Sequence, residues 1–143
     1  MPQQVTLDRA YLDMAQIWSR LSRAERMKVG CLIVKDGSII SDGYNGTPSG
    51  FDNTCEHQDP RVSFSSSITK PEVLHAESNA ITKLAKSTQS SAGSTVYITI
   101  SPCIDCAKLI IQSGVSRVVF GDVYRNEDGL DLLRKANILV DQI

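Results

Sequence analysis

Two cysteines three residues apart, directly behind a proline, constrain this chain more than any other feature. The run Ser101-Pro102-Cys103-Ile104-Asp105-Cys106 can place both thiolates on one ion if a helix begins there. Two thiolates do not complete a zinc site, so the fold must bring further ligands from elsewhere in the chain. The upstream run His75-Ala76-Glu77 offers an imidazole and a carboxylate. The fold must therefore place these two segments side by side.

Composition favours one domain and weakens the case for a nucleic-acid substrate without excluding it. The chain has 143 residues, 41% of them hydrophobic, without internal repeats or linkers, and we expect a single domain over residues 1–143. The formal net charge of −1 provides no general basic field for a nucleic-acid backbone. No apolar run approaches the roughly 18 residues of a membrane helix, and no signal-peptide pattern is present. We expect a cytoplasmic protein with neither nucleic acid nor membrane as a partner.

Alternating helical and strand patterns predict an α/β fold, a layered sheet with helices on both faces. An amphipathic helix is expected at residues 6–22, capped by Thr6, with an apolar stripe of Leu7, Tyr11, Met14, Trp18 and Leu21. After this helix, the residue patterns predict strands at 29–34 and 39–44 and a loop at 51–71. Helices are predicted at 71–87, 103–113 and 127–136, and they alternate with strands at 94–100, 115–120 and 138–140.

The motif residues fall at the starts of two consecutive helices in this scheme. A helix N-terminus lowers the pKa of a cysteine and favours its thiolate. Two thiolates, from Cys103 and Cys106, and the neutral imidazole of His75 would hold one Zn²⁺ and leave a fourth position for water. Glu77, two residues beyond His75, is the expected proton carrier, which takes a proton from that water and passes it to the substrate.

Other interpretations of these residues remain. Cys55 or His57 could close a structural zinc site as a fourth ligand, or the C-x-x-C pair could be redox-active. Cys55-Glu56-His57 could form a second metal site, although two ligands do not close one. Cys31 lies in a predicted buried strand and is expected in the core. Catalytic zinc is favoured because the two motifs begin consecutive helices and because a structural site has no use for Glu77.

The motifs resemble those of the zinc-dependent cytidine/deoxycytidylate deaminase superfamily, and within it the deoxycytidylate (dCMP) deaminases. The run His75-Ala76-Glu77-Ser78-Asn79-Ala80-Ile81 resembles the first zinc motif of that family, and the run from Ser101 to Lys108 resembles the second. The loop Gly43-Tyr44-Asn45-Gly46, followed by Pro48 and Gly50, resembles a loop typical of dCMP deaminases. The resemblance covers residues 29–125.

This resemblance implies a three-layer cytidine-deaminase-like fold, with a five-stranded mixed sheet flanked by helices on both faces. It implies zinc-dependent hydrolysis of dCMP to dUMP and ammonia, which supplies dUMP for thymidylate synthesis. The ligands would be His75, Cys103 and Cys106, and the proton shuttle Glu77. It also implies a homo-oligomer, commonly a hexamer, activated by dCTP and inhibited by dTTP, with Mg²⁺ accompanying the triphosphate.

The resemblance also suggests nucleotide contacts. Asn45 would meet the sugar, and the backbone at Ala76 and Ser101 would read the base. The effector loop would comprise Gly43, Tyr44, Asn45 and Gly46. The 5′-phosphate needs donors near the motif-bearing ends, and the candidates there are Arg26, Lys28, Tyr124 and Arg125.

Three further functions are distinguishable from this one. A deaminase of tRNA adenosine would need a basic groove and stacking aromatic residues, whereas aromatic residues make up only 6% of the chain. A deaminase of free nucleosides would not depend on a phosphate site. A non-catalytic structural-zinc module would not need Glu77. Some phage-type relatives carry a second, structural zinc, and of its ligands only Cys55 has a counterpart here.

Overall fold

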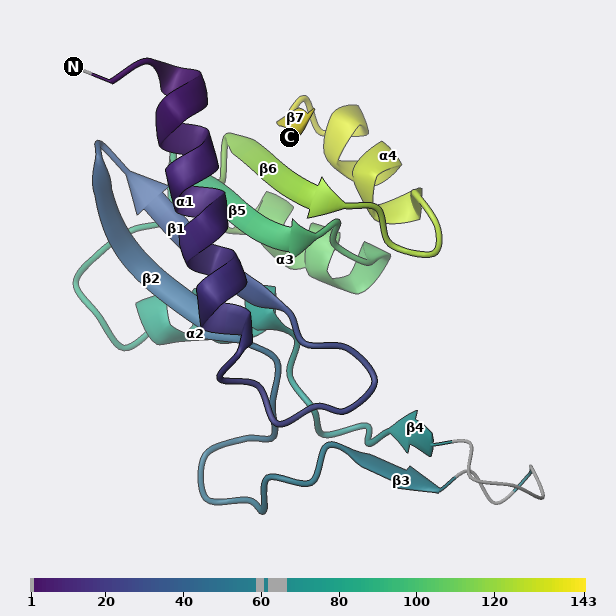
Figure 1. Cartoon of the computed structure of the whole chain (residues 1–143). Coiled ribbons are helices and arrows are strands. Elements are labelled where there is room, and N and C mark those ends of the chain that lie inside the picture. Colours follow the sequence, from purple (N-terminus) through teal and green to yellow (C-terminus); the bar gives the residue numbers. More distant parts are fainter. Residues whose placement is uncertain (1, 59–60, 62–66) are drawn as a thin grey trace.

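A five-stranded mixed sheet forms the centre of the protein (Figure 1). The structure is a computed structural model that describes residues 2–58, 61 and 67–143. The helices are α1 (Gln4–Ser19), α2 (Ala76–Leu84), α3 (Ile104–Gln112) and α4 (Asp128–Lys135). The sheet strands are β1 (Gly30–Lys35), β2 (Ser38–Tyr44), β5 (Thr95–Ile100), β6 (Arg117–Asp122) and β7 (Leu139–Gln142), in the order β2-β1-β5-β6-β7.

The sheet combines an antiparallel hairpin with a parallel half. Strand β1 pairs antiparallel with both β2 and β5. Strand β6 pairs parallel with β5, and β7 pairs parallel with β6. Helix α1 covers one face, while α2 and α3 cover the other and α4 packs beside α3 (Figure 1). This arrangement confirms the predicted α/β fold, and it leaves the N-termini of α2 and α3 as neighbours.

Apolar residues on alternate positions of the central strands fill two core layers. The larger layer lies between the sheet and helices α2, α3 and α4, and includes the fully buried Cys31, as expected. The smaller layer lies under α1. None of the described helices is long and apolar enough to cross a membrane.

Helix α1 differs from its prediction in both its ends and its buried face. It begins at Gln4 after Gln3, so Thr6 is not its cap, and it ends at Ser19 rather than at residue 22. Met14 and Leu21 are exposed. The residues buried in the helix are Asp8, Leu12, Ala15 and Ser19. Apolar spacing predicted the helix but misplaced its inner face, because a buried aspartate occupies that face.

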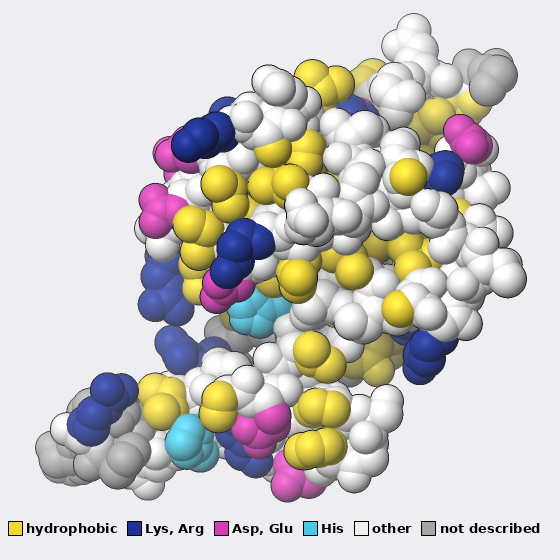
Figure 2. Space-filling view, turned by 180° about the vertical axis from the view of Figure 1, so that it is seen from behind, with side chains coloured by type: hydrophobic (Ala, Val, Ile, Leu, Met, Phe, Trp, Pro, Cys, Tyr) yellow, Lys and Arg dark blue, Asp and Glu magenta, His cyan; other side chains and the backbone are white. Residues whose placement is uncertain are grey.

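The segment predicted as a loop contains a small ribbon instead. Strands β3 (Glu56–Gln58) and β4 (Ser67–Thr69) pair antiparallel in a sheet of their own. This ribbon extends from the body of the molecule (Figures 1 and 2). Residues 59–60 and 62–66 of the predicted loop lie outside the described residues. The helix predicted from residue 71 begins only at Ala76, since the chain first forms a turn and a bridge from Leu74 to Gly46.

Asp8 is the polar residue that attaches α1 to the sheet. Its carboxylate accepts two hydrogen bonds from the Arg117 guanidinium, at 2.7 and 2.8 Å, and one from the Tyr97 hydroxyl at 2.6 Å. Its side chain is only 5% exposed. The hydrogen bond from Arg117 lowers the pKa of Asp8 from 3.8 to about 2, against the opposing effect of burial. This paired, buried carboxylate explains why a charged residue is found on the inner face of α1.

We predict that Asp8→Asn lowers the free energy of unfolding by about 2 kcal/mol at pH 7, because a pKa shift of this size corresponds to that stabilisation. The folded-state pKa lies below the unfolded one. The contribution is therefore complete above about pH 5 and is lost as the pH falls through 4 towards 2. Urea unfolding of both proteins at pH 7, 4 and 2.5 measures it. A difference that stays constant down to pH 2.5 would contradict this role for Asp8.

Candidate active site

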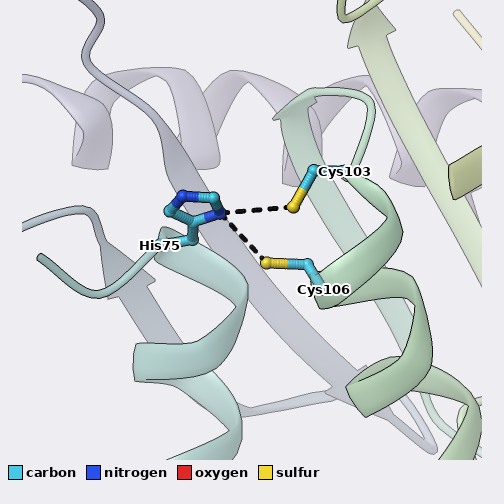
Figure 3. A group of neighbouring side chains, drawn as sticks. All are labelled: His75, Cys103 and Cys106. Carbon is cyan, nitrogen blue, oxygen red and sulfur yellow. Dashed lines mark hydrogen bonds between the residues drawn. The ribbon is translucent and has the colours of Figure 1, made fainter. Parts of the chain in front are cut away.

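Three potential metal ligands meet where helices α2 and α3 begin (Figure 3). His75 precedes the first turn of α2, Cys103 precedes that of α3, and Cys106 lies within the first turn of α3. The His75 Nδ1 atom lies 3.2 Å from the Cys106 sulfur and 3.5 Å from the Cys103 sulfur. The three ligand atoms all lie within 4.8 Å of one another. The fold thus joins the two motifs that are far apart in the sequence.

Backbone packing fixes the segment that carries Cys103. The Ser101 N–H donates to the Asp122 carbonyl at 2.8 Å, so β6 holds the end of β5. Gly129 of α4 lies directly on this segment, and a Cβ atom there would overlap the carbonyl oxygen of Pro102. Only glycine allows α4 to approach so closely. Helix α4 therefore supports the cysteine motif from behind.

The pKa values of the two cysteines shift in opposite directions. The pKa of Cys103 is lowered to about 4, first by the hydrogen bond from Cys106 and then by that from His75. The pKa of Cys106 is raised, because its thiol donates that hydrogen bond and is largely buried. An imidazole and two sulfurs in such proximity form a donor set that suits Zn²⁺. The residues present therefore fit zinc.

Glu77 is a buried carboxyl group beside this ligand set. Its side chain lies in the first turn of α2, and the residue is only 4% exposed. Burial raises its pKa from 4.5 to about 7. A carboxyl group with a pKa near neutrality can both accept and return a proton at physiological pH. Glu77 thus has the environment that a proton carrier requires.

A cavity of about 270 Å³ opens next to the ligands. The predicted site residues in its lining are Arg26, Asn45, His75, Ala76, Glu77, Ser101, Cys103, Tyr124 and Arg125. Lys28 is exposed and does not line this cavity. Sequence reasoning missed Ala24, Met27, Val29, Glu56, Thr69, Val73, Ile100 and Val123. Most of these come from irregular segments and from the ribbon, whose folding no local pattern indicated.

Asn45 makes two structural hydrogen bonds with its side chain. Its Oδ1 atom accepts the Val29 N–H at 2.9 Å, and its Nδ2 atom donates to the Met27 carbonyl at 2.8 Å. These bonds fasten the segment between α1 and β1 to the end of β2. Asn45 therefore builds the cavity wall as well as lining it.

Tyr124 and Arg125 form another wall of the cavity. The backbone N–H of Tyr124 donates to the Ser101 hydroxyl at 2.6 Å, and Ser101 is 1% exposed. The Arg125 guanidinium lies over the Tyr124 ring, 5.4 Å from its centroid. A buried serine thus anchors a segment that presents a cation and a phenol towards the cavity.

The residues of the predicted effector loop lie in two different surroundings. Gly43 packs against α2, where a Cβ atom would overlap the Ala76 carbonyl oxygen, so this glycine serves helix packing. The other three loop residues line a second cavity of about 430 Å³. Its lining comprises Arg20, Leu21, Arg23, Tyr44, Asn45, Gly46, Thr47, Asn53 and Cys55. Asn45 thus borders both cavities.

The remaining cysteine and histidine do not join the ligand group. The Cys55 sulfur is buried near the Asn53 carbonyl oxygen, at 3.7 Å, and His57 lies exposed on the ribbon. Among residues 2–58, 61 and 67–143, His75, Cys103 and Cys106 are the one group of three or more residues able to hold a metal ion. Neither a second metal site nor a fourth protein ligand is found in that part of the chain.

Comparisons with known proteins agree with this geometry. Residues 5–122 match the family model described as the cytidine and deoxycytidylate deaminase zinc-binding region. The chain is 37% identical to the deoxycytidylate deaminase of Enterobacteria phage T4, over 90% of this chain and 86% of that protein. It is 38% identical to that of Mycobacterium phage D29, over 79% of this chain and 92% of that protein.

A solved structure matches almost the whole chain. The dCMP deaminase of cyanophage S-TIM5, in complex with dCMP and dUMP, superimposes with a TM-score of 0.91 at 43% identity, covering 99% of this chain and 100% of that one. This match confirms the three-layer fold with five strands that the sequence led us to expect.

We predict that Cys106→Ser removes zinc from the purified protein, because a hydroxyl group is a far weaker zinc ligand than a thiolate. Elemental analysis should find about one zinc per chain in the unaltered protein, as three ligands with an open position hold one ion. Cys55→Ser is the matched control, since it changes a buried cysteine outside the ligand group. Loss of zinc from Cys55→Ser, with retention by Cys106→Ser, would contradict this assignment.

Proposed function

Because this chain belongs to the cytidine and deoxycytidylate deaminase family, we propose that it hydrolyses dCMP to dUMP and ammonia with one catalytic Zn²⁺. The observation that carries this proposal is Glu77, buried beside the ligands His75 and Cys103 in a cavity that also holds two arginines. A relative that shares 43% of its residues with this chain has been solved with dCMP and dUMP bound. The product would supply dUMP for thymidylate synthesis.

Zinc bound by His75, Cys103 and Cys106 would lower the pKa of a water molecule and make it a nucleophile at neutral pH. In the reaction, water adds its oxygen to C4 of cytosine and the amino group leaves as ammonia. Glu77 accepts a proton from the water and donates it to N3 of the ring. It then takes the proton of the new hydroxyl group on C4 and delivers it to the departing amine. Its pKa of about 7 suits both directions of transfer.

The cavity walls orient the base. Ala76 and Ser101 line the cavity, and their backbone groups would exchange hydrogen bonds with the edge of the cytosine ring. Apolar side chains of Val29, Val73 and Ile100 complete the surface and exclude water from the ring faces. Asn45 keeps the wall in place and borders the expected position of the sugar.

The 5′-phosphate meets Arg26, Tyr124 and Arg125 in this proposal. All three line the cavity, and arginine binds phosphate oxygens with two parallel hydrogen bonds. Lys28, the fourth sequence candidate, would take no part because it does not line the cavity. The described residues on the face opposite α1 include Lys and Arg side chains next to Asp and Glu side chains (Figure 2). The formal net charge of −1 favours a mononucleotide over a nucleic acid.

We predict that Glu77→Gln lowers ammonia release from dCMP by at least about 10²-fold, because the amide cannot carry the proton. Zinc content and the circular dichroism spectrum should be unchanged, since glutamine has nearly the same shape. The matched control is Glu72→Gln, which changes an exposed carboxylate. Unreduced turnover in Glu77→Gln would exclude this residue as the proton carrier.

The substrate itself is tested with the unaltered protein. Ammonia release from dCMP should greatly exceed that from deoxycytidine, because only dCMP engages the arginines. Equal turnover of the two would refute the phosphate site and would favour a nucleoside deaminase.

We further propose that the second cavity binds the nucleotide effectors, dCTP with Mg²⁺ as activator and dTTP as inhibitor, in a homo-oligomer, with a hexamer favoured. The cavity combines Arg20 and Arg23 with the loop residues Tyr44, Asn45 and Gly46. The two guanidinium groups, next to the backbone of this glycine-containing loop, suit the phosphate chain of a nucleoside triphosphate. Asn45 lies in both cavities and would connect effector binding with the substrate wall.

We predict that Arg20→Ala and Arg23→Ala each weaken activation by dCTP–Mg²⁺ by about 10-fold in the half-maximal dCTP concentration, as charge-assisted hydrogen bonds are lost. Turnover of dCMP at saturating substrate without effector should stay unchanged. Arg9→Ala, on the exposed part of α1, is the matched control. An unchanged dCTP response in both variants would place the effector elsewhere.

A further inference from the structure

We propose that Glu56 is a positioning residue that holds Arg26 at the wall of the substrate cavity and so sets the preference for a 5′-phosphate. This inference rests on the proposed function, and it assigns a task to a buried acid that the reaction itself does not use. Glu56 begins the ribbon strand β3, whereas Arg26 lies in the segment between α1 and β1.

The carboxylate of Glu56 is committed to the backbone around Arg26. Its Oε2 atom accepts the N–H of Glu25 at 3.0 Å and the N–H of Arg26 at 3.1 Å. Glu56 is only 9% exposed, so these charge-assisted bonds face little competition from water. One buried oxygen atom thus fixes two consecutive peptide groups.

The segment at residues 20–29 depends on such anchors because it contains neither helix nor strand. The Asn45 side chain holds the end of this segment nearest β1, through hydrogen bonds with Met27 and Val29. The Ser22 hydroxyl donates to the Asn45 carbonyl at 2.8 Å near its start. Glu56 is the anchor of the middle, directly at Arg26.

The Arg26 side chain remains available for a ligand. It lines the cavity and is exposed, and within the described part of the chain its guanidinium has no hydrogen bond or ion pair. The Glu56 carboxylate binds the backbone of Arg26 and does not neutralise its side chain. The position of the cation is therefore fixed while its charge stays free to bind a phosphate.

Electrostatics alone would give Glu56 the opposite effect. A carboxylate near a phosphate site repels the phosphate, so its removal would strengthen binding if charge were all that mattered. Positioning predicts instead that its removal weakens phosphate binding, because Arg26 loses its fixed location. The sign of the effect separates the two explanations.

The test measures binding of dUMP and of deoxyuridine by calorimetry, which does not require turnover. The unaltered protein should prefer dUMP, and Glu56→Ala should reduce the dUMP-to-deoxyuridine affinity ratio by about 10-fold with little change for deoxyuridine. Glu56→Gln retains an uncharged hydrogen-bond acceptor, so its dUMP-to-deoxyuridine affinity ratio should lie between those of the unaltered protein and Glu56→Ala. Glu72→Ala removes an exposed carboxylate and is the control for charge.

A double-variant comparison then tests the connection to Arg26. If Glu56 acts through Arg26, the double variant with both Glu56→Ala and Arg26→Ala should have the same dUMP-to-deoxyuridine affinity ratio as Arg26→Ala alone. Additive losses, an unchanged ratio in Glu56→Ala or a higher ratio would each overturn the inference. If circular dichroism shows that Glu56→Ala does not fold, the same affinity ratios measured for Glu56→Gln, alone and combined with Arg26→Ala, test the inference.

Failure of the proposed function has a different signature. It would be absence of ammonia release from dCMP by the zinc-loaded protein, whereas the Glu56 inference is decided by dUMP binding alone. An unaltered protein that binds deoxyuridine as tightly as dUMP would overturn the Glu56 inference whatever its turnover.

Discussion

The meeting of two helix N-termini is the constraint on which the rest of the structure depends. His75 and Cys103 directly precede α2 and α3, so their side chains converge only if both helices start at the same end of the sheet. The parallel pairing of β5 and β6 sets where α3 starts, and the bridge between Gly46 and Leu74 holds the chain just before α2 at the end of β2. Gly43 and Gly129 then allow β2 and α4 to press against the two motifs. The ligand group is thus held from several sides by main-chain contacts.

Part of the cavity wall comes from two segments that stand apart from the central helices and strands. Residues 20–29 and the ribbon are not part of the main sheet, yet they supply Arg26, Glu56 and Thr69 to its walls. The side chains of Asn45 and Glu56 accept hydrogen bonds from backbone N–H groups of residues 20–29 and thereby hold this segment in place. The starts of α2 and α3 therefore carry the ligand group and Glu77, whereas hydrogen bonds between side chains and backbone hold the other cavity walls.

The motifs could be read from the sequence because they obey local rules. Cysteine spacing, the proline before it and helical periodicity predicted where Cys103, Cys106, His75 and Glu77 would lie. The inner face of α1 could not be read in that way, since Asp8 is buried only because Arg117, far along the chain, pairs with it. The role of Glu56 was equally hidden, as its partners are backbone groups about 30 residues upstream. Both features depend on contacts between segments that are far apart in the sequence, and local residue patterns do not reveal such contacts.

Gly129 illustrates how far the influence of the site extends. It faces the carbonyl groups of Pro102 and Cys103 across a gap that no side chain can enter. It belongs to a helix that contributes nothing to the lining of either cavity. A genetic screen for inactive alleles would accordingly recover this position together with the metal ligands. Its phenotype would imitate a catalytic lesion, although the residue lies behind the motif and outside the reach of any substrate.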